Sequence, residues 1–507
     1  MVSFETEREM LEAFQKYIHE KDVDIITGWN IFGFDLEYIF KRALLTGCHE
    51  EFFNLGSGLC RRRAGTCRRR SPADTADALM LVAAAPVQAF EIREVVSKKG
   101  IVAWFVHDKS VPLVTLSFVF RGAGSATDSD GKEGTGDMVS SLLDEGAGDI
   151  NSADFQRKRE EIAARMSFSA GRDHFSGRMQ TLTSEKDTAF RLLKLALTSP
   201  RFDEKPVERI RSRMLASLRQ QAENPRRISG RLWNRIVFEG HPYSKPGAGT
   251  EETVPKISRT DLKSFVRDRF TRNRLLIGIV GDIGEAELAR RLDEVFGGLP
   301  ETGPEFDIPE IVPAGAGRTI VVKKPIPQSV VVLGQKGIKR TDPDWYAALL
   351  VTRIFGGGGL SSRLFEEVRE KRGLAYSVYA YLSPMERSAI IGGGVATQNA
   401  RAAKSISVIR AEWRKLSEKG ITKKELMDAK TNLNGSFPLR LGSGRGIANL
   451  LVGIQVSKLG MNYIKKRPSL INGVTLANAN RVARWLYNAD DLTVVVVGDP
   501  DGVVSSP

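Results

Sequence analysis

The chain has 507 residues, of which 41% are apolar and 27% charged, and its formal net charge is +14. This composition predicts a folded protein of two to four domains and excludes wholesale disorder. Three cysteines are too few for a disulfide framework. No run of about eighteen apolar residues predicts a membrane-spanning helix. Six positive charges fall in the clusters at residues 61–63 and 68–70, and the others are interleaved with acidic residues, so nucleic-acid binding by the main body is not expected.

Residues 1–55 predict a helix, a short buried strand and a second helix. The run GWNIFGFD at residues 28–35 resembles the second exonuclease motif of family B DNA polymerases, as does the DIITG run before it. The resemblance implies that Asp35 helps to hold a catalytic metal ion and that Asn30 supports the site. Phosphodiester cleavage by two metals needs several converging carboxylates. The first and third motifs of that family are not found, so we expect a non-functional fragment.

Residues 56–89 change character again. Two triple-arginine clusters precede an apolar run at residues 78–85 and a small-x-small ending, VQA, at residues 87–89. These are the three parts of a secretory signal peptide, but this segment is internal. An Ala-rich linker or a short helix is the alternative. We favour a former signal sequence with unrelated coding sequence joined in front of it.

From about residue 90 the chain contains a repeat. A helix at residues 261–270 is followed by LLIGIVGD, and a helix at residues 477–486 is followed by LTVVVVGD. The Pro- and Gly-rich stretch at residues 304–317 is typical of a linker. The pattern therefore predicts two homologous α+β domains, residues 90–303 and 318–507, each with a sheet covered by helices. Within the first domain, SEKD at residues 184–187 predicts a capping box that begins a helix.

This layout, together with several motifs, resembles the pitrilysin-type peptidases, the inverted HxxEH zinc family that includes mitochondrial processing peptidase. The resemblance covers residues 95–502. The matching runs are RGAGS at 121–125, residues 134–148, HPY at 241–243, VGD at 280–282 and FGGGGLSSRLFEEVREKRGLAYSV at 355–378. The last run is much more specific than a lone glycine motif. It implies the two-domain sheet-and-helix fold of that family.

The zinc motif of the family is absent from this chain. Two histidines one helical turn apart bind zinc, and a glutamate between them moves the proton of the bound water. In the matching run at residues 134–143, Asp137 and Ser141 occupy the histidine positions and Ser140 occupies the glutamate position. Aligning the Asn-Pro pair at residues 224–225 places Ser217 at the third ligand. We therefore expect a plain amphipathic helix here and no metal or cofactor bound by this chain.

The resemblance also implies that Arg369 and Tyr376 bind the substrate backbone and stabilise the oxyanion formed when water attacks the peptide carbonyl. A fixed guanidinium and a fixed phenol suit that task. The alternatives are a solvated helix charge for Arg369 and a packed core aromatic for Tyr376. The four glycines at residues 356–359 predict a flexible loop or a simple turn, and His241 is expected to be structural.

Some members of the family work as pairs, in which one subunit holds zinc and the other holds the arginine and tyrosine. The leading hypothesis is a non-metal-binding subunit of a two-subunit zinc peptidase, with a zinc-bearing homologue as partner and unfolded peptides as substrates. A structural core protein of the same fold is the rival, and a nucleic-acid enzyme led by residues 1–55 is a third candidate. Family resemblance and the signal-like segment point to the periplasm, whereas the internal position of that segment points away from export.

Overall fold

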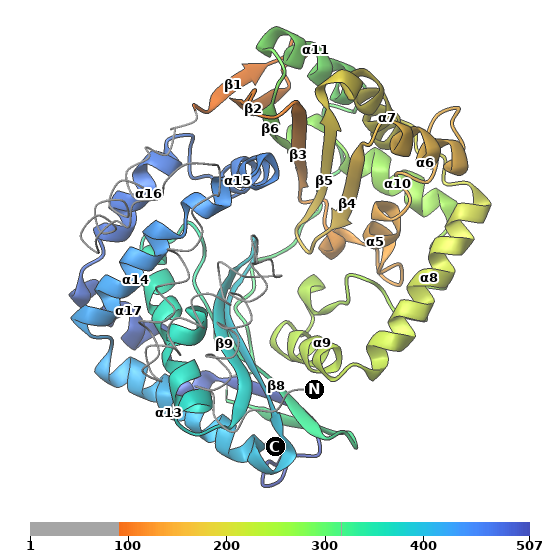
Figure 1. Ribbon diagram of the computed structural model, residues 1–507. Coiled ribbons are helices and arrows are strands. Elements are labelled where there is room, and N and C mark those ends of the chain that lie inside the picture. Colours follow the sequence, from red (N-terminus) through yellow and green to blue (C-terminus); the bar gives the residue numbers. More distant parts are fainter. Residues whose placement is uncertain (1–90, 316, 507) are drawn as a thin grey trace, which may run out of the picture. The chain divides into compact units, whose positions relative to one another are not determined.

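The computed structural model describes residues 91–315 and 317–506 (Figure 1). The expectations for residues 1–55 and 56–89 lie outside the described residues. Within the described part the chain forms two sheets, one in each half, and each sheet is accompanied by its own set of helices. This confirms the expected α+β class.

The first half contains a six-stranded sheet with the order β1-β2-β6-β3-β5-β4. Its strands are β1 (Arg93–Val96), β2 (Val102–His107), β3 (Leu113–Arg121), β4 (Arg165–Ala170), β5 (His174–Leu182) and β6 (Leu275–Gly281). Its helices are α5 (Thr135–Ser140), α6 (Ser152–Glu161), α7 (Lys186–Thr198), α8 (Glu204–Glu223), α9 (Pro225–Val237), α10 (Arg259–Arg269) and α11 (Glu285–Phe296).

The second half contains a five-stranded sheet with the order β7-β11-β8-β10-β9. Its strands are β7 (Thr319–Lys323), β8 (Gln328–Lys336), β9 (Ala375–Pro384), β10 (Ala389–Gln398) and β11 (Thr493–Gly498). Its helices are α12 (Trp345–Thr352), α13 (Ala402–Lys419), α14 (Lys423–Gly435), α15 (Gly444–Val456), α16 (Tyr463–Asn472) and α17 (Leu476–Leu486), with π-helical segments at Arg353–Gly357 and Phe365–Glu370.

The two halves share one topology. Taken in chain order, strands β2 to β6 occupy the same positions in the first sheet as strands β7 to β11 in the second. Each sheet has one parallel pair, which is β2 with β6 in the first and β7 with β11 in the second. The other neighbouring strands are antiparallel. The repeat read from the sequence is visible at Gly281 and Gly498, which end the equivalent strands with positive φ angles. A Cβ at Gly281 would lie 2.1 Å from the oxygen of Leu113, so only glycine fits this crossing.

Each half has its own apolar core between its sheet and its helices. Phenylalanines fill much of the first core, where Phe120 and Phe270 stack with their ring centroids 4.6 Å apart. In the second core, Phe355 packs edge-on against Trp413. Burial of these side chains is the main stabilising contribution in each half.

The other face of each sheet is covered by a helix from the opposite half. Helix α9 packs on β8 and β11, and α15 packs on β3 and β6, as Figure 1 shows for α15. The approach is close: a Cβ at Gly334 would lie 2.6 Å from the Trp233 ring, and one at Gly278 would lie 2.6 Å from the oxygen of Ala448. The two halves are therefore joined by a reciprocal exchange of helices.

Several local expectations need correction. The capping box at residues 184–187 is wrong, because a short 3₁₀ turn precedes α7 and its N-cap, Glu185, makes no side-chain cap. The four-glycine run is not a loop, since Gly356 lies in a π-helical turn where a Cβ would be 2.6 Å from Ala380 N.

The described residues between α11 and β7 contain no helix or strand. None of the described helices combines the length and apolarity that crossing a bilayer requires.

Candidate functional site

The positions that the family resemblance assigns to the zinc motif lie on two helices that contact each other, α5 and α8. Asp137 and Ser140 are in α5, Ser141 is its C-cap, and Ser217 is in α8. Helix α5 is shorter than expected, with only six residues, but Met138 and the following Leu142 and Leu143 face the core as predicted. The expected helix with a core-facing apolar side is therefore present at this position.

The side chains at these positions do not suit zinc, which prefers imidazole, thiolate and carboxylate ligands. The Ser140 hydroxyl donates to the backbone oxygen of Asp137 at 2.8 Å, and the Ser217 hydroxyl accepts from the side-chain amide of Gln221 at 2.9 Å. Burial raises the pKa of Asp137, and the charge of Arg213 opposes that rise. Across the described residues there is no group of three or more His, Cys, Asp or Glu side chains placed to hold a metal ion.

Arg369 and Tyr376 lie together, on the last turn of the π-helical segment and on the strand that follows it. The Arg369 guanidinium stacks over the Tyr376 ring at 4.6 Å and over the Phe365 ring at 4.7 Å. Neither structural alternative describes them. Arg369 is held between two rings rather than solvated, and Tyr376 is 75% exposed rather than packed in a core. The pair presents a guanidinium and a free phenol on one surface.

A β-bulge in β9 explains the exposure of Tyr376. The register of β9 against β10 shifts so that Ser377 pairs with Ala396 while Ala375 pairs with Thr397, which leaves Tyr376 without a partner residue. The extra residue turns the Tyr376 side chain away from the buried face that Ala375 and Val378 occupy. Bulges re-aim side chains in this way at functional sites.

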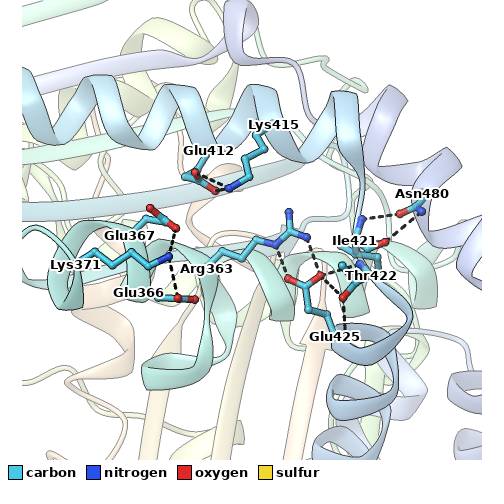
Figure 2. Close-up of polar contacts among 10 residues, drawn as sticks. All are labelled: Arg363, Glu366, Glu367, Lys371, Glu412, Lys415, Ile421, Thr422, Glu425 and Asn480. Carbon is cyan, nitrogen blue, oxygen red and sulfur yellow. Dashed lines mark hydrogen bonds and ion pairs between the residues drawn. The ribbon is translucent and has the colours of Figure 1, made fainter.

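The charged residues that precede and follow Arg369 in the sequence pair with one another. Lys371 contacts Glu366 at 3.0 Å and Glu367 at 2.7 Å (Figure 2). Arg372 also binds Glu367, at 2.6 Å. These pairs satisfy the neighbouring carboxylates, and among the described residues the one carboxylate paired with Arg369 is that of Glu370, at 3.8 Å. The Arg369 guanidinium therefore keeps most of its donors available.

The start of the same segment is tied to α14 by a bidentate ion pair, Arg363 with Glu425, at 2.6 and 2.7 Å (Figure 2). Glu425 also forms a capping box with Thr422, the N-cap of α14. Burial acts to raise the pKa of Glu425, but the hydrogen bonds from Arg363 and Thr422 outweigh it and lower the pKa to about 2. This contact fixes the segment that carries Arg369.

Two further tyrosines extend the exposed surface, and sequence reasoning missed them. Tyr379 and Tyr381 stack with ring centroids 6.1 Å apart and lie over Gly394 and Gly392 of β10. The signal that could have identified them is the alternation along β9, in which Val378 and Ala380 are buried and the tyrosines are not.

His241 is structural, as expected. It is buried, its Nδ1 accepts from Tyr243 N at 3.1 Å, and its Nε2 lies 3.0 Å from the oxygen of Pro309. The His241 side chain therefore holds the segment around Pro309, which connects the two halves, against the first half.

Comparisons with known proteins show which family the chain resembles. The family model described as "Peptidase M16 inactive domain" matches residues 256–433. The chain is 26% identical over 390 residues to "Non-peptidase homolog YmxG" of Helicobacter pylori, covering 77% of this chain and 90% of that protein. It is 25% identical to "Uncharacterized zinc protease YmxG" of Bacillus subtilis, covering 73% and 90%.

Among solved structures, the peptidase M16 inactive domain from Pseudomonas fluorescens is similar with a TM-score of 0.76 and 25% identity, covering 82% of this chain and 99% of that one. The fold is thus that of the M16 inactive domain, and the part of the chain that the structure describes contains no group of side chains placed to hold a metal ion. The chain is therefore similar to proteins of the M16 peptidase family, and the segment at residues 256–433 matches the model of the inactive domain of that family.

The first residues of the chain match a different family model. Residues 1–69 match the family model "DNA polymerase family B, exonuclease domain". This match includes Asn30 and Asp35, which lie outside the residues that the structure describes. Two different family models therefore match two separate segments of the chain.

Proposed function

We propose that this chain is the non-metal-binding subunit of a two-subunit zinc peptidase. In this proposal it supplies Arg369 and Tyr376 to peptide hydrolysis, and a zinc-bearing homologue supplies the metal and the activated water. The observation that carries the proposal is the stacked pair itself. The chain has lost every zinc-motif position, yet it presents an exposed phenol against a guanidinium with few other partners.

The chemistry of the pair suits this role. A peptide carbonyl that gains negative charge during attack is stabilised by donors already in position, and a guanidinium and a phenol are such donors. Stacking on Phe365 and Tyr376 limits the motion of Arg369. The Arg363–Glu425 contact holds the start of its segment, so the donors lose little freedom when substrate binds.

The test is turnover of an unstructured fluorogenic peptide by the co-purified pair. Tyr376→Phe removes only the hydroxyl, and Arg369→Lys keeps the charge but loses the planar donor group. We expect each change to lower kcat roughly 100-fold, with a smaller effect on KM. Arg372→Lys, three residues away and paired with Glu367, is the matched control. Unchanged kcat in both variants, in a pair that still assembles, would refute the proposed roles.

The rival is a structural core protein of the same fold. Purification of the native complex separates the two hypotheses, because a zinc-bearing homologue in the complex supports the peptidase subunit and a membrane-protein complex supports the rival. We further propose that the functional protein acts in the periplasm. Fractionation of the source cells tests this location.

A further inference from the structure

Helix α9 carries a row of arginines on the side opposite to its packed face. The buried residues of this helix, such as Trp233 and Val237, face the second sheet. Arg227, Arg231 and Arg235 follow one another at intervals of four residues, so they form one ridge along the helix. All three are exposed or half-buried. We refer to these three residues as the arginine ridge.

The arginine ridge has no acidic partners among the described residues, where no hydrogen bond or ion pair involves its guanidinium groups. The preceding helix is different. In α8, Arg209 pairs with Glu145 and Arg219 pairs with Glu251. Two arginines of the neighbouring helix are therefore paired with carboxylates, whereas the three of the arginine ridge are not.

The arginine ridge also works against the stability of its own helix. Like charges four residues apart repel each other on a helix surface. The first turn contains Arg226 and Arg227 and no acidic residue, where the helix dipole favours negative charge. Local conflicts of this kind are expected at functional positions, where a ligand supplies the missing charge.

Helix α9, which carries the arginine ridge, lies over the same face of the second sheet as Tyr379 and Tyr381. Asn234, three residues after Arg231, accepts a hydrogen bond from Arg172 at 3.3 Å. The charge of Arg172 in turn acts on Tyr381. Register places Gly334, which lies under Trp233, opposite Gly392, and Gly392 opposite Tyr381, so α9 and the tyrosines lie on the same face of the sheet.

From this geometry we infer that the arginine ridge binds an acidic segment of the polypeptide substrate. Guanidinium groups pair with carboxylates through parallel hydrogen bonds, and the exposed tyrosine rings on the same face of the sheet suit the apolar parts of an extended chain. The inference rests on the proposed function, because it assigns the class of peptide that this subunit selects: segments rich in aspartate and glutamate.

The experiment uses the purified full chain without its partner, and fluorescence anisotropy of three labelled, unstructured 20-residue probes. One probe is rich in glutamate, the second replaces glutamate with glutamine, and the third replaces it with lysine. At low ionic strength, where exposed charges are least screened, we expect the acidic probe to bind most tightly. The combined variant Arg227→Gln, Arg231→Gln, Arg235→Gln should bind it roughly tenfold more weakly, since three exposed ion pairs are lost.

The matched control is Lys419→Gln, Lys423→Gln, Lys424→Gln, which removes the same charge from the exposed end of α13 and start of α14. Binding of the acidic probe should then change less than twofold. The midpoint of thermal unfolding of the arginine variant should not fall, because repulsion within α9 is removed, and this confirms that the variant is folded.

Three results would overturn the inference: equal binding by the arginine variant and the wild type, an equal loss in the lysine control, or a single-stranded oligonucleotide bound as tightly through the same arginines. The proposed function fails separately, if Arg369→Lys and Tyr376→Phe leave turnover of the pair unchanged. Binding by the isolated chain and turnover by the pair thus distinguish the two failures.

Discussion

Trp233 in the first half donates a hydrogen bond from its indole Nε1 to the carbonyl oxygen of Thr493, at the start of β11 in the second half, at 3.2 Å. The second half returns an equivalent contact, in which Gln455 of α15 donates to the oxygen of Ile277 in β6 at 2.9 Å. Strands β6 and β11 are the equivalent strands of the repeat. Each half therefore contributes a helix, and a side-chain donor, to the same strand of the other.

Trp233→Ala should lower the free energy of unfolding by about 3–5 kcal/mol, since a buried indole between the halves is removed. Trp233→Phe keeps an aromatic ring but leaves the Thr493 oxygen unpaired, and we expect a loss of about 1–2 kcal/mol. Urea unfolding followed by circular dichroism measures both. Equal midpoints for Trp233→Ala and the wild type would show that α9 does not join the halves as described.

Alanine at the glycines under the exchanged helices tests the closeness of the packing. Gly278→Ala and Gly334→Ala each place a methyl group 2.6 Å from an atom of the opposing helix, so each should cost about 1–3 kcal/mol in unfolding free energy. The matched controls are Gly230→Ala in α9 and Gly453→Ala in α15, where the new methyl group meets open space. Both controls should instead stabilise the chain by about 0.5–1 kcal/mol.

The Arg363–Glu425 ion pair predicts a pH dependence. The folded-state pKa of Glu425 is about 2, below the ordinary value of 4.5, so its stabilisation is present above pH 4.5 and is lost as the pH falls toward 2. Glu425 is partly exposed, and after allowance for solvent screening we expect Glu425→Gln to cost about 1–2 kcal/mol at pH 7. The difference between variant and wild type in urea unfolding should shrink at low pH. A difference independent of pH would contradict the assignment.

His174 predicts a second pH dependence, at the contact between β5 and the β9–β10 turn. Burial lowers the pKa of His174, against the opposing charges of Glu386 and Asp173, while Arg121 adds to the lowering. The folded chain thus binds the proton less readily than the unfolded chain, whose histidine titrates near 6.5. The stability from this site is complete above pH 6.5 and falls as the pH drops below it.

The measurement is the thermal midpoint of the wild type and of His174→Asn between pH 5 and 8. In the wild type, His174 Nδ1 accepts from Gly122 N at 3.4 Å, and the asparagine side chain keeps an acceptor. The wild type should lose stability relative to the variant toward pH 5. Parallel profiles would show that His174 does not titrate in this range.

The contact between helices α5 and α8 predicts that metal binding can be restored. The combined variant Asp137→His, Ser140→Glu, Ser141→His, Ser217→Glu recreates the inverted motif, with two imidazoles one turn apart and a glutamate on α8. We expect about one zinc ion per chain after dialysis, measured by elemental analysis. Asp137→His with Ser141→His alone is the control and should hold zinc more weakly. Zinc content equal to the wild type would mean that these four positions do not converge.

Much of the fold follows from the sequence pattern. The alternation in β3 and β8 and the repeated hydrophobic strands ending in Gly281 and Gly498 predict two equivalent sheets, and the structure confirms them. The exchange of α9 and α15 could not be predicted in the same way. An amphipathic pattern shows that a helix has an apolar face, but it does not say which sheet covers that face.

The candidate site shows the same division. The family motifs identify Arg369 and Tyr376. The surroundings of these two residues depend on the bulge at Tyr376, and no local residue pattern predicts a bulge. The glycines of β10, which provide room for the Tyr379 and Tyr381 rings, act through contacts between strands. Such contacts depend on register, which a single strand does not reveal.

The exchange of helices also bears on the history of the molecule. A chain that consisted of one half alone would expose the apolar face of its sheet, because the helix that covers this face comes from the other half. Two such chains could cover both faces by exchanging that helix. The present arrangement is what fusion of a symmetric homodimer would leave behind. Because α9 and α15 make these contacts, side-chain changes at Asp137, Ser140, Ser141 and Ser217 in α5 and α8 leave the joint between the halves in place.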